Sequence, residues 1–336
     1  MDTKFNVVLV ADRLYTDDIN TEFDASDLEK ISDEYYYGLY EELKKVCGGT
    51  VFHYQSPKDL ADNAYKHKDD IVFTIYGGEK SRNRMALVPA VCESYGLKYV
   101  GADAYARIIC QDKYLSKIYC ERFGLRTAPS FLLEDEQDIQ LMKDLTFPLV
   151  LKPNMEGSSI GITDDSIVYN MEQASSLARR LFKIHNQPVL AEEFIEGKEV
   201  SFYIIGQGGH FSLLSALEIY MEGDEDFLCK HLYSAEVKHH SDDIVHRDIT
   251  YMISPEDIEI VKQIFISLGK MDFMRVDCRL RDNVLYLIEL TPDAYIGPYS
   301  GFIDAARTIG KNYTEVIDLI IHTAYSSNQS QYASLK

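Results

Sequence analysis

The sequence predicts an α/β protein whose second part changes to an α+β arrangement. Apolar strand patterns and helical patterns alternate in the first hundred residues, with strands at 4–10, 50–54 and 70–75 and helices at 27–46, 57–68 and 83–95. Such alternation predicts a parallel sheet with helices on its faces. Further along, VLAEEFIEG, EVSFYIIG and FSLLSALEI are separated only by glycine turns, which predicts antiparallel strands.

The same patterns divide the chain into three parts. We expect an N-terminal α/β domain over 1–105, a central subdomain over 106–188 and a C-terminal subdomain over 189–328. Later elements complete these parts, namely helices at 112–123, 136–144, 170–185, 255–269 and 301–325, strands at 98–102 and 129–133, and a hairpin at 271–290. Residues 220–250 are polar and aperiodic, and a loop of that length is usually a functional lid or partly disordered.

The charge balance excludes several kinds of partner. The 336 residues carry 54 acidic and 34 basic side chains, a formal net charge of −20. Nucleic-acid binding depends on Lys and Arg contacts with phosphates, and anionic membranes attract basic segments, so we expect neither partner. A nucleotide would need a few local cations and a metal to overcome the overall field.

Cysteine usage and hydropathy predict a cytoplasmic protein. The six cysteines have no C-x-x-C spacing, which fits buried free thiols in a reducing compartment. The N-terminus MDTKFNVVLVAD lacks the basic start and long apolar run of a signal peptide. No apolar run approaches the roughly 20 residues that cross a bilayer.

Charged residues alternate along one strand of the expected hairpin. Arg275, Asp277 and Arg279 share one face, because side chains alternate along a strand. With a turn centred near Asp282, Arg275 should lie opposite Glu289 and Asp277 one diagonal away. Two carboxylates and a guanidinium then converge, and such oxygens suit Mg²⁺ or Mn²⁺. The alternative is an ion-pair cluster on a solvated sheet face.

A glycine-serine loop follows a buried strand pattern in LVLKPNMEGSSIGIT, residues 149–163. The strand runs into Lys152, and the loop then presents backbone N–H groups around Gly157 and Gly161. These features predict a bound phosphate. The alternative is a plain turn with Lys152 in solvent.

Glu192 and Glu193 end another strand pattern, before Phe194 and Ile195. A carboxylate at this place can accept hydrogen bonds from a ribose, and the backbone can read an adenine edge. The alternative is an edge strand protected by charge.

In this order the segments resemble the ATP-grasp ligases, and within them the D-alanine–D-alanine ligase branch. The matching motifs are Asp112-Lys113, LKPNMEGSSIG, EEFIEGKE, MRVDC and LIELT. The resemblance implies an ATP-grasp fold, in which two subdomains clasp ATP behind an N-terminal domain. It also implies that ATP phosphorylates a carboxylate and that an amine attacks the acyl phosphate.

The resemblance implies a role for each matching residue. Catalytic roles fall to Arg275, which stabilises the tetrahedral intermediate, to Lys230, which reaches the γ-phosphate, and to Ser158, which positions the first substrate. ATP contacts fall to Lys113, Lys152, Ser159, Glu192, Glu193, Phe194, Ile195 and Glu199. Among these, Lys113 and Lys152 resemble the lysines that hold the phosphates, and Glu192 and Glu199 resemble the adenine- and ribose-side residues of the nucleotide pocket. Metal ligation falls to Asp277 and Glu289, with Thr291 at the third metal position, and Ser300 stands where a serine binds the substrate carboxylate.

Departures from the family pattern cluster on the substrate side. Thr291 replaces an asparagine that helps to bind the second metal, with Asp293 as a substitute oxygen donor, and Tyr295 stands at the position of an oxyanion-binding glycine. His231 stands where the family tends to have tyrosine. The N-terminal motif for the first D-alanine is not recognisable.

Two arginines and two histidines outside the family motifs are further candidates. Arg82 and Arg84, in YGGEKSRNR, are candidates for binding a substrate carboxylate or phosphate, since arginine forms a bidentate fork; the alternative is solvated arginines. His239 and His240 fit solvated loop residues better than metal ligands.

The favoured hypothesis is therefore an ATP- and Mg²⁺-dependent carboxylate–amine ligase acting on small amino-acid or amine substrates other than two D-alanines. A true D-alanine–D-alanine ligase is the close alternative. A nucleotide-binding regulatory protein is the alternative from another class, and substrate-dependent ADP release separates it from a ligase. Ligation to a carrier protein or a peptide end stays open, and the resemblance favours a homodimer.

Overall fold

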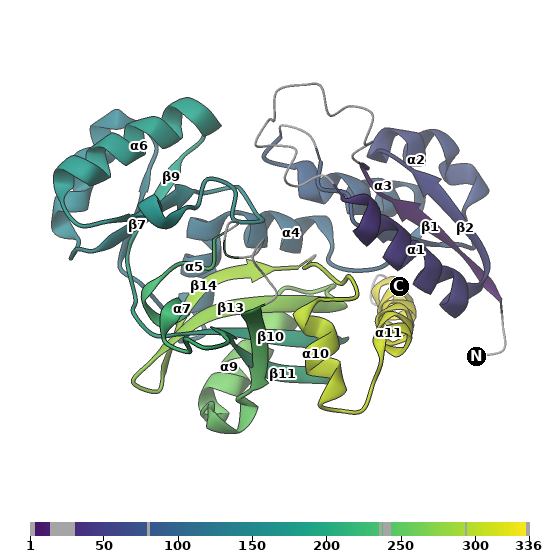
Figure 1. The fold of residues 1–336 in the computed structure, drawn as a ribbon. Helices are drawn as coiled ribbons and strands as arrows, with labels where there is room; N and C mark the ends of the chain where they lie inside the picture. Colours follow the sequence, from purple (N-terminus) through teal and green to yellow (C-terminus); the bar gives the residue numbers. More distant parts are fainter. Residues whose placement is uncertain are drawn as a thin grey trace.

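The computed structural model describes residues 4–13, 31–78, 81–234, 237, 243–292 and 294–333. Three sheets organise this part of the chain (Figure 1). A four-stranded parallel sheet belongs to the N-terminal part, a four-stranded antiparallel sheet to the central part, and a six-stranded sheet lies below both in this view.

The N-terminal sheet confirms the parallel α/β prediction. Its strands follow the order β2 (Gly48–Tyr54), β1 (Phe5–Val10), β3 (Ile71–Thr74) and β4 (Lys98–Tyr99), and all neighbours are parallel. Three α-helices cover it, namely α1 (Asp33–Cys47), α2 (Pro57–Asn63) and α3 (Leu87–Tyr95), with 3-10 turns at Ala64–Lys66 and Arg84–Ala86.

Helix α1 shows how local sequence fixes these elements. The Ser32 side chain accepts a hydrogen bond from the Tyr35 N–H and caps the helix start. The helix ends at Gly48, whose φ of 59° is the left-handed conformation that glycine adopts without steric cost. Leu39 and Leu43 lie on the buried face between these caps, as helical spacing predicts.

The six-stranded sheet confirms the antiparallel prediction for the second half. Its order is β12 (Ile244–Asp248), β11 (His210–Met221), β10 (Lys198–Gln207), β13 (Phe273–Arg281), β14 (Val284–Thr291) and β5 (Arg126–Thr127). Only β5 is parallel to its neighbour among the described strands of this sheet. Helix α9 (Pro255–Ser267) packs on its apolar face through Val261, Ile264 and Phe265.

The central sheet has the order β6 (Ser130–Leu133), β9 (Val189–Glu193), β7 (Leu149–Pro153) and β8 (Ile167–Val168). Helix α6 (Met171–His185) and a 3-10 helix at Glu136–Asp144 cover one face. The helix expected at 136–144 is therefore of the tighter type. Because β9 pairs within this sheet, the chain passes to the large sheet between 193 and 198, and the domain boundary at 188/189 stays a prediction.

The segment expected to be an aperiodic lid over 220–250 has more regular structure than its sequence indicates. Helix α7 (Phe227–Lys230) and strand β12 lie within it, and β12 pairs with β11. Tertiary pairing determines the strand, which a polar sequence such as IVHRD does not reveal. His239 and His240 lie outside the described residues, as does Asp293.

The remaining helices are α4 (Ala104–Gln111), α5 (Lys113–Glu121), α10 (Gly301–Arg307) and α11 (Tyr313–Ala333). Helix α11 returns to the N-terminal domain and packs beside α1 (Figure 1). None of the helices in the described part of the chain is long and apolar enough to cross a membrane.

A buried ion pair ties three regions together at this return. Lys270 Nζ lies 2.7 Å from Asp272 Oδ2 and donates to Gly101 O at 2.8 Å. Asp272 also accepts from the Gly101 N–H and from Ser327 Oγ, both at 2.7 Å. The start of β13, the end of the N-terminal domain and helix α11 therefore share one buried network, which we call the Lys270–Asp272 network.

Candidate active site

One face of the six-stranded sheet carries a row of charged and polar side chains. On β13, Arg275, Asp277 and Arg279 alternate with buried apolar residues, as predicted. Their direct partners on β10 are Tyr203, Ser201 and Glu199. Opposite side chains in antiparallel strands share a face, so all six project to the same side of the sheet.

The register on the other flank differs from the prediction. Asp277 lies directly opposite Glu289, and Arg275 lies opposite Thr291. The connecting turn has two residues, Asp282 and Asn283, both with positive φ, so its centre falls between them. A bulge near Asp277 then shifts the pairing by one residue. The predicted pairing of Arg275 with Glu289 is therefore wrong, and the two carboxylates are closer neighbours than expected.

Arg275 and Asp277 form a bidentate pair. The Nε–Oδ1 distance is 2.7 Å and the Nη2–Oδ2 distance is 2.8 Å. Ser201 Oγ donates to the same carboxylate at 2.6 Å, and Glu289 Oε1 lies 3.9 Å from Arg275 Nη2. Burial acts to lower the pKa of Arg275, but the adjacent Asp277 raises it above its ordinary value. Arg275 is thus a fixed positive charge beside two carboxylates.

Helix α5 brings a lysine to this cluster. Lys113 is the first residue of the helix, whose start is capped by the Asp112 side chain. Asn154, which follows β7, holds Asp112 through a hydrogen bond of 2.8 Å and accepts from the Tyr114 N–H at 2.9 Å. Lys113 Nζ lies 3.1 Å from Glu289 Oε2. The helix start, the loop after β7 and the large sheet therefore meet at Lys113.

A second cation group lies on the central sheet. Lys152 on β7 and Glu192 on β9 form an ion pair of 2.6 Å, and Lys117 from helix α5 lies 2.7 Å from the other oxygen of Glu192. Lys117 also donates to Leu287 O on β14 at 3.0 Å. Burial acts to raise the pKa of Glu192, but the two lysines lower it to about 2. Glu192 is therefore a permanent anion between two ammonium groups.

Lys117 is a site residue that the sequence reasoning missed. It lies four residues after Lys113, on the same face of α5, and that spacing was the available signal. Replacing Lys117 with methionine should lower the free energy of unfolding by roughly 2 kcal/mol, because Leu287 O loses its donor and Glu192 keeps one cation. Chemical denaturation measures this difference. An unchanged midpoint would show that the Lys117 ammonium adds nothing to the folded state.

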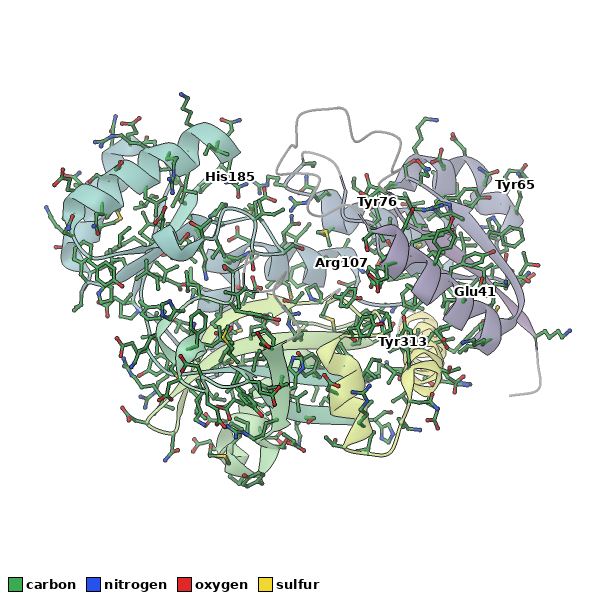
Figure 2. The ribbon with its side chains drawn as sticks, in the orientation of Figure 1. Glu41, Tyr65, Tyr76, Arg107, His185 and Tyr313 are labelled. Atoms are coloured by element: carbon green, nitrogen blue, oxygen red, sulfur yellow. The ribbon has the colours of Figure 1, made fainter. Side chains whose placement is uncertain are left out.

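The glycine-serine loop adopts an unusual backbone. Ser158 and Ser159 have φ values of 50° and 61°, and Gly161 has 73°. A Cβ at Gly161 would lie 2.7 Å from Pro153 and 2.8 Å from Nε2 of His185, which is labelled at the end of α6 in Figure 2. Non-glycine residues with a left-handed backbone conformation are strained, and such residues concentrate at functional sites. The loop geometry therefore requires glycine at position 161, and the phosphate expected at this loop stays a prediction.

Arg84 connects this loop to the N-terminal domain. Its Nη2 donates to Glu156 Oε2 at 3.0 Å and to Met155 O at 3.1 Å, and the side chain is buried. Glu156 Oε1 accepts from Gln187 at 2.6 Å. The structure thus engages Arg84 Nη2 with the loop, and the substrate role of Arg84 stays a prediction. Arg82 is exposed, so its substrate role stays a prediction.

The residues predicted for the nucleotide separate into two groups. Glu192 and Glu199 are buried beside cations. Glu193 points elsewhere, because neighbouring side chains of a strand alternate, and its Oε1 accepts from the Thr146 N–H at 2.8 Å. Ile195 is buried, and the Phe194 N–H donates to Pro148 O at 2.9 Å. The structure therefore does not bring the Glu193 carboxylate into the cluster.

Ser300 precedes helix α10 on the substrate side. Its side chain is buried, and its hydroxyl has no hydrogen-bond partner among the described residues. The Tyr203 ring packs against the neighbouring Gly301, where a Cβ would lie 2.0 Å from the hydroxyl oxygen. A buried hydroxyl without a protein partner is suited to a polar ligand group.

The residues of the expected lid segment, 220–250, differ in what they contact. The Tyr233 carbonyl accepts from Ser159 Oγ at 3.1 Å, so the lid segment contacts the glycine-serine loop. His231 stacks on Phe227 with ring centroids 4.3 Å apart. Lys230 is exposed at the end of α7, and no described hydrogen bond or ion pair joins it to the charged cluster. Its role at the γ-phosphate stays a prediction.

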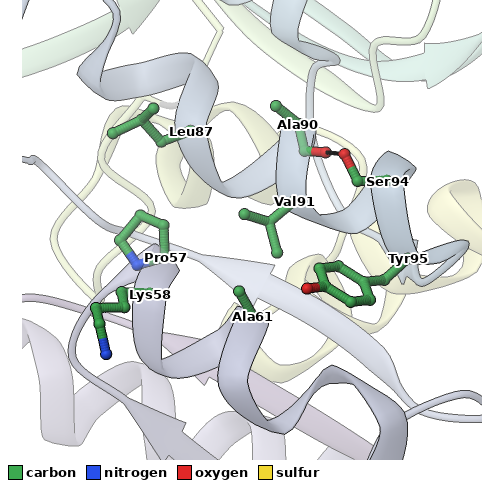
Figure 3. A pocket seen from close by; sticks show the side chains of 8 residues that line it. All are labelled: Pro57, Lys58, Ala61, Leu87, Ala90, Val91, Ser94 and Tyr95. Carbon is green, nitrogen blue, oxygen red and sulfur yellow. Dashed lines mark hydrogen bonds between the residues drawn. The ribbon is translucent and has the colours of Figure 1, made fainter.

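A groove elsewhere on the surface is unrelated to this cluster. It measures about 290 Å³ and lies between α2 and α3 on the N-terminal domain (Figure 3). Its lining is mostly apolar, with Lys58 as the charged member. The chemistry of the charged cluster is absent there, and we place the candidate active site at the cluster.

Comparison with known proteins identifies similar sequences. A profile described as "D-ala D-ala ligase C-terminus" matches residues 120–322, more than half of the chain. The D-alanine–D-alanine ligase of Bordetella pertussis is 29% identical over 294 residues, which cover 85% of this chain and 88% of that protein. The ligase of Fervidobacterium nodosum is 27% identical over 288 residues, covering 79% and 87%.

Solved structures agree on the fold. The D-alanine–D-alanine ligase of Bacillus anthracis complexed with ATP has a TM-score of 0.72 at 20% identity, covering 97% of this chain and 99% of that one. VanG D-Ala:D-Ser ligase of Enterococcus faecalis has a TM-score of 0.68 at 17% identity, covering 96% and 100%. These likenesses confirm the predicted ATP-grasp fold. With the match over 120–322, they show that the chain belongs to the D-alanine–D-alanine ligase family.

Proposed function

We propose that this chain is an ATP- and Mg²⁺-dependent ligase that joins a carboxylate to an amine, and that its substrate pair differs from two D-alanines. The observation that carries the reaction type is the pairing of Lys113 with Glu289 and of Lys152 with Glu192. One lysine belongs to helix α5 and the other to the central sheet, while the Asp277–Glu289 carboxylates belong to the large sheet. A triphosphate between the two sheets would meet cations on one side and metal-binding oxygens on the other.

The carboxylates fit a magnesium ion. Asp277 and Glu289 are direct neighbours across two strands, and the described residues contain no group of three or more metal-binding side chains. Mg²⁺ typically takes one or two carboxylates and completes its octahedron with phosphate oxygens and water. Asp277 and Glu289 would hold the ion, which when bound neutralises charge on the transferring phosphate.

The reaction then needs positioning rather than a protein nucleophile. A carboxylate oxygen attacks the γ-phosphorus, the bond to the β-γ bridging oxygen breaks, and ADP leaves. The amine next attacks the acyl carbon, loses a proton and displaces phosphate. Lys113 and Lys152 would orient the phosphates, and Arg275 would stabilise negative charge on the tetrahedral intermediate. The segment at Tyr233, which contacts the glycine-serine loop, would exclude water from the acyl phosphate.

Substrate-side residues support a changed substrate pair. Tyr295, at the position of the family's oxyanion glycine, packs on Tyr35 with ring centroids 4.4 Å apart. The Tyr35 hydroxyl accepts from the Ile296 N–H at 3.3 Å, which joins helix α1 to the loop before Ser300. Tyr295 therefore fills space at this position that a glycine would leave open. The second candidate, D-alanine–D-alanine ligation, is favoured by the names of the relatives.

ADP release with pairs of amino acids and amines tests the proposal. We expect ADP to appear only when one carboxylate and one amine substrate are present together, with a pair other than two D-alanines giving the highest kcat/KM. If two D-alanines give the highest value, the changed-substrate proposal is wrong and the ligase chemistry stands. If no pair releases ADP although ATP binds, the ligase proposal is wrong.

Lys152→Ala tests the phosphate assignment separately. Loss of one charge-assisted contact with a phosphate should weaken ATP binding by about tenfold or more. Isothermal titration with ATP and Mg²⁺ measures the affinity, and Lys183→Ala, an exposed lysine on α6, serves as the control. Equal affinities of the wild type and the Lys152 variant would remove Lys152 from the phosphate site.

A further inference from the structure

Arg279 occupies an unusual position in the charged row. It lies directly opposite Glu199 in the register of β10 and β13, and its Nε is 3.0 Å from Glu199 Oε2. Both side chains are buried. The guanidinium also lies over the Phe194 ring, 5.4 Å from its centroid. Arg279 therefore touches two residues that we assign to the nucleotide pocket.

The rest of the guanidinium binds backbone of other segments. Nη1 donates to Gly197 O at 2.9 Å and also to Leu228 O, and Nη2 donates to His231 O at 2.8 Å. Gly197 belongs to the connection between β9 and β10, while Leu228 and His231 lie in and directly after helix α7. One side chain thus joins the nucleotide segment, the large sheet and the start of the lid.

These contacts use all three guanidinium nitrogens. A buried guanidinium with each nitrogen engaged has little capacity left for a ligand, so Arg279 acts through the groups that it holds. A carboxylate held by a buried ion pair is preorganised to accept hydrogen bonds from ribose hydroxyls. Carbonyl contacts at Leu228 and His231 keep the lid start docked beside that same carboxylate.

We propose that Arg279 is a positioning residue that couples ribose recognition by Glu199 to docking of the α7 segment, residues 227–231. This inference rests on the proposed function, because it takes Glu199 as a ribose-side residue. A nucleotide with ribose hydroxyls tightens the Glu199–Arg279 pair and thereby the carbonyl contacts of the α7 segment. A nucleotide that lacks the ribose hydroxyls binds through its phosphates and does not tighten the contacts of the α7 segment.

The test compares ADP with 2′,3′-dideoxy-ADP, both without turnover. For the wild type we expect about tenfold tighter binding of ADP, the value of one charge-assisted hydrogen bond. We also expect stronger hydrogen-exchange protection of the α7 segment with ADP than with the dideoxy nucleotide. Arg279→Met should reduce the affinity ratio to near one and abolish the difference in protection.

Two further variants separate ribose recognition from docking of the α7 segment. Glu199→Gln should lose the preference for ADP while Arg279 still holds the α7 segment through its carbonyl bonds. Arg279→Lys keeps a cation near Glu199 but lacks the fork that reaches three carbonyls, so it should keep part of the preference and lose the protection. Arg179→Met, which removes an exposed ion pair with Glu136, is the control and should behave as the wild type.

The outcomes distinguish this inference from the proposed function. If the wild type does not bind ADP, the proposed function fails. If it binds both nucleotides equally, or if Arg279→Met keeps both the preference and the protection, the coupling is wrong and the nucleotide site stands. If Arg279→Met does not fold, Glu199→Gln and Arg279→Lys decide, and wild-type behaviour of both would overturn the inference.

Discussion

Replacing Glu289 with glutamine is expected to lower kcat on the order of a thousandfold while the protein stays folded. Glu289 lies opposite Asp277 and 3.1 Å from Lys113, so one side chain links the proposed metal ligands to the lysine that we propose for the phosphates. The amide keeps the shape of the carboxylate and removes its charge. Substrate-dependent ADP release measures kcat, and circular dichroism verifies the fold.

The loss should fall on kcat more than on the affinity for ATP. Charge on the phosphate increases toward the transition state, where a missing metal ligand has its largest effect. Glu256→Gln, on the exposed side of helix α9, is the matched control and should keep wild-type kcat. A Glu289 variant within threefold of the wild type would exclude this carboxylate from the reaction.

Replacing Asp272 with alanine is expected to lower the free energy of unfolding by roughly 3–5 kcal/mol. Asp272 is fully buried, pairs with Lys270 at 2.7 Å, and accepts from Gly101 and Ser327. Its removal leaves the Lys270 ammonium buried with one carbonyl contact. The effect should exceed that of surface pairs, because the lysine cannot recover its hydration.

Urea unfolding of the Asp272 variant measures this loss. Arg179→Ala, in an exposed pair with Glu136, should change the same free energy by no more than about 0.5 kcal/mol. The double variant Lys270→Met with Asp272→Leu should recover part of the loss, since neither charge then remains buried. Equal midpoints for the wild type and Asp272→Ala would show that the Lys270–Asp272 network does not join its three regions.

Strand alternation was enough to predict which face of the hairpin carries the chemistry. Arg275, Asp277 and Arg279 share a face because a strand has a period of two, and this holds without knowledge of tertiary contacts. The parallel N-terminal sheet and the antiparallel large sheet also follow from patterns within single segments. Most family motifs fall on this scaffold at the starts and ends of strands and helices, while MRVDC lies within β13.

The register across the hairpin could not be predicted from the same pattern. Without the bulge between the Asp277 and Cys278 pairings, the two-residue turn would place Ile288 opposite Asp277. The bulge places Glu289 there instead. Bulges often re-aim a side chain beside an active site, and their energetic cause lies in the packing of both strands. The sequence reasoning centred the turn on Asp282, half a residue before its observed centre, and it included no bulge. It therefore placed Arg275, and not Asp277, opposite Glu289.

Ion pairs between residues far apart in the sequence also could not be predicted. Glu192 meets Lys117 across 75 positions, and Arg84 meets Glu156 across 72. Sequence patterns show that such residues are charged, and only the fold shows which charges meet. The contact of Arg84 with Glu156 was therefore not predicted, and Arg279 had no assigned role despite its place beside Arg275 and Asp277 on one face of β13.

A crystal structure with Mg²⁺ and a non-hydrolysable ATP analogue tests the central claim most directly. We predict phosphate oxygens within hydrogen-bond distance of Lys113 Nζ and Lys152 Nζ, and a metal ion ligated by Asp277 and Glu289. A nucleotide bound at another surface, with the Lys113–Glu289 and Lys152–Glu192 pairs unchanged from those described above, would contradict the account.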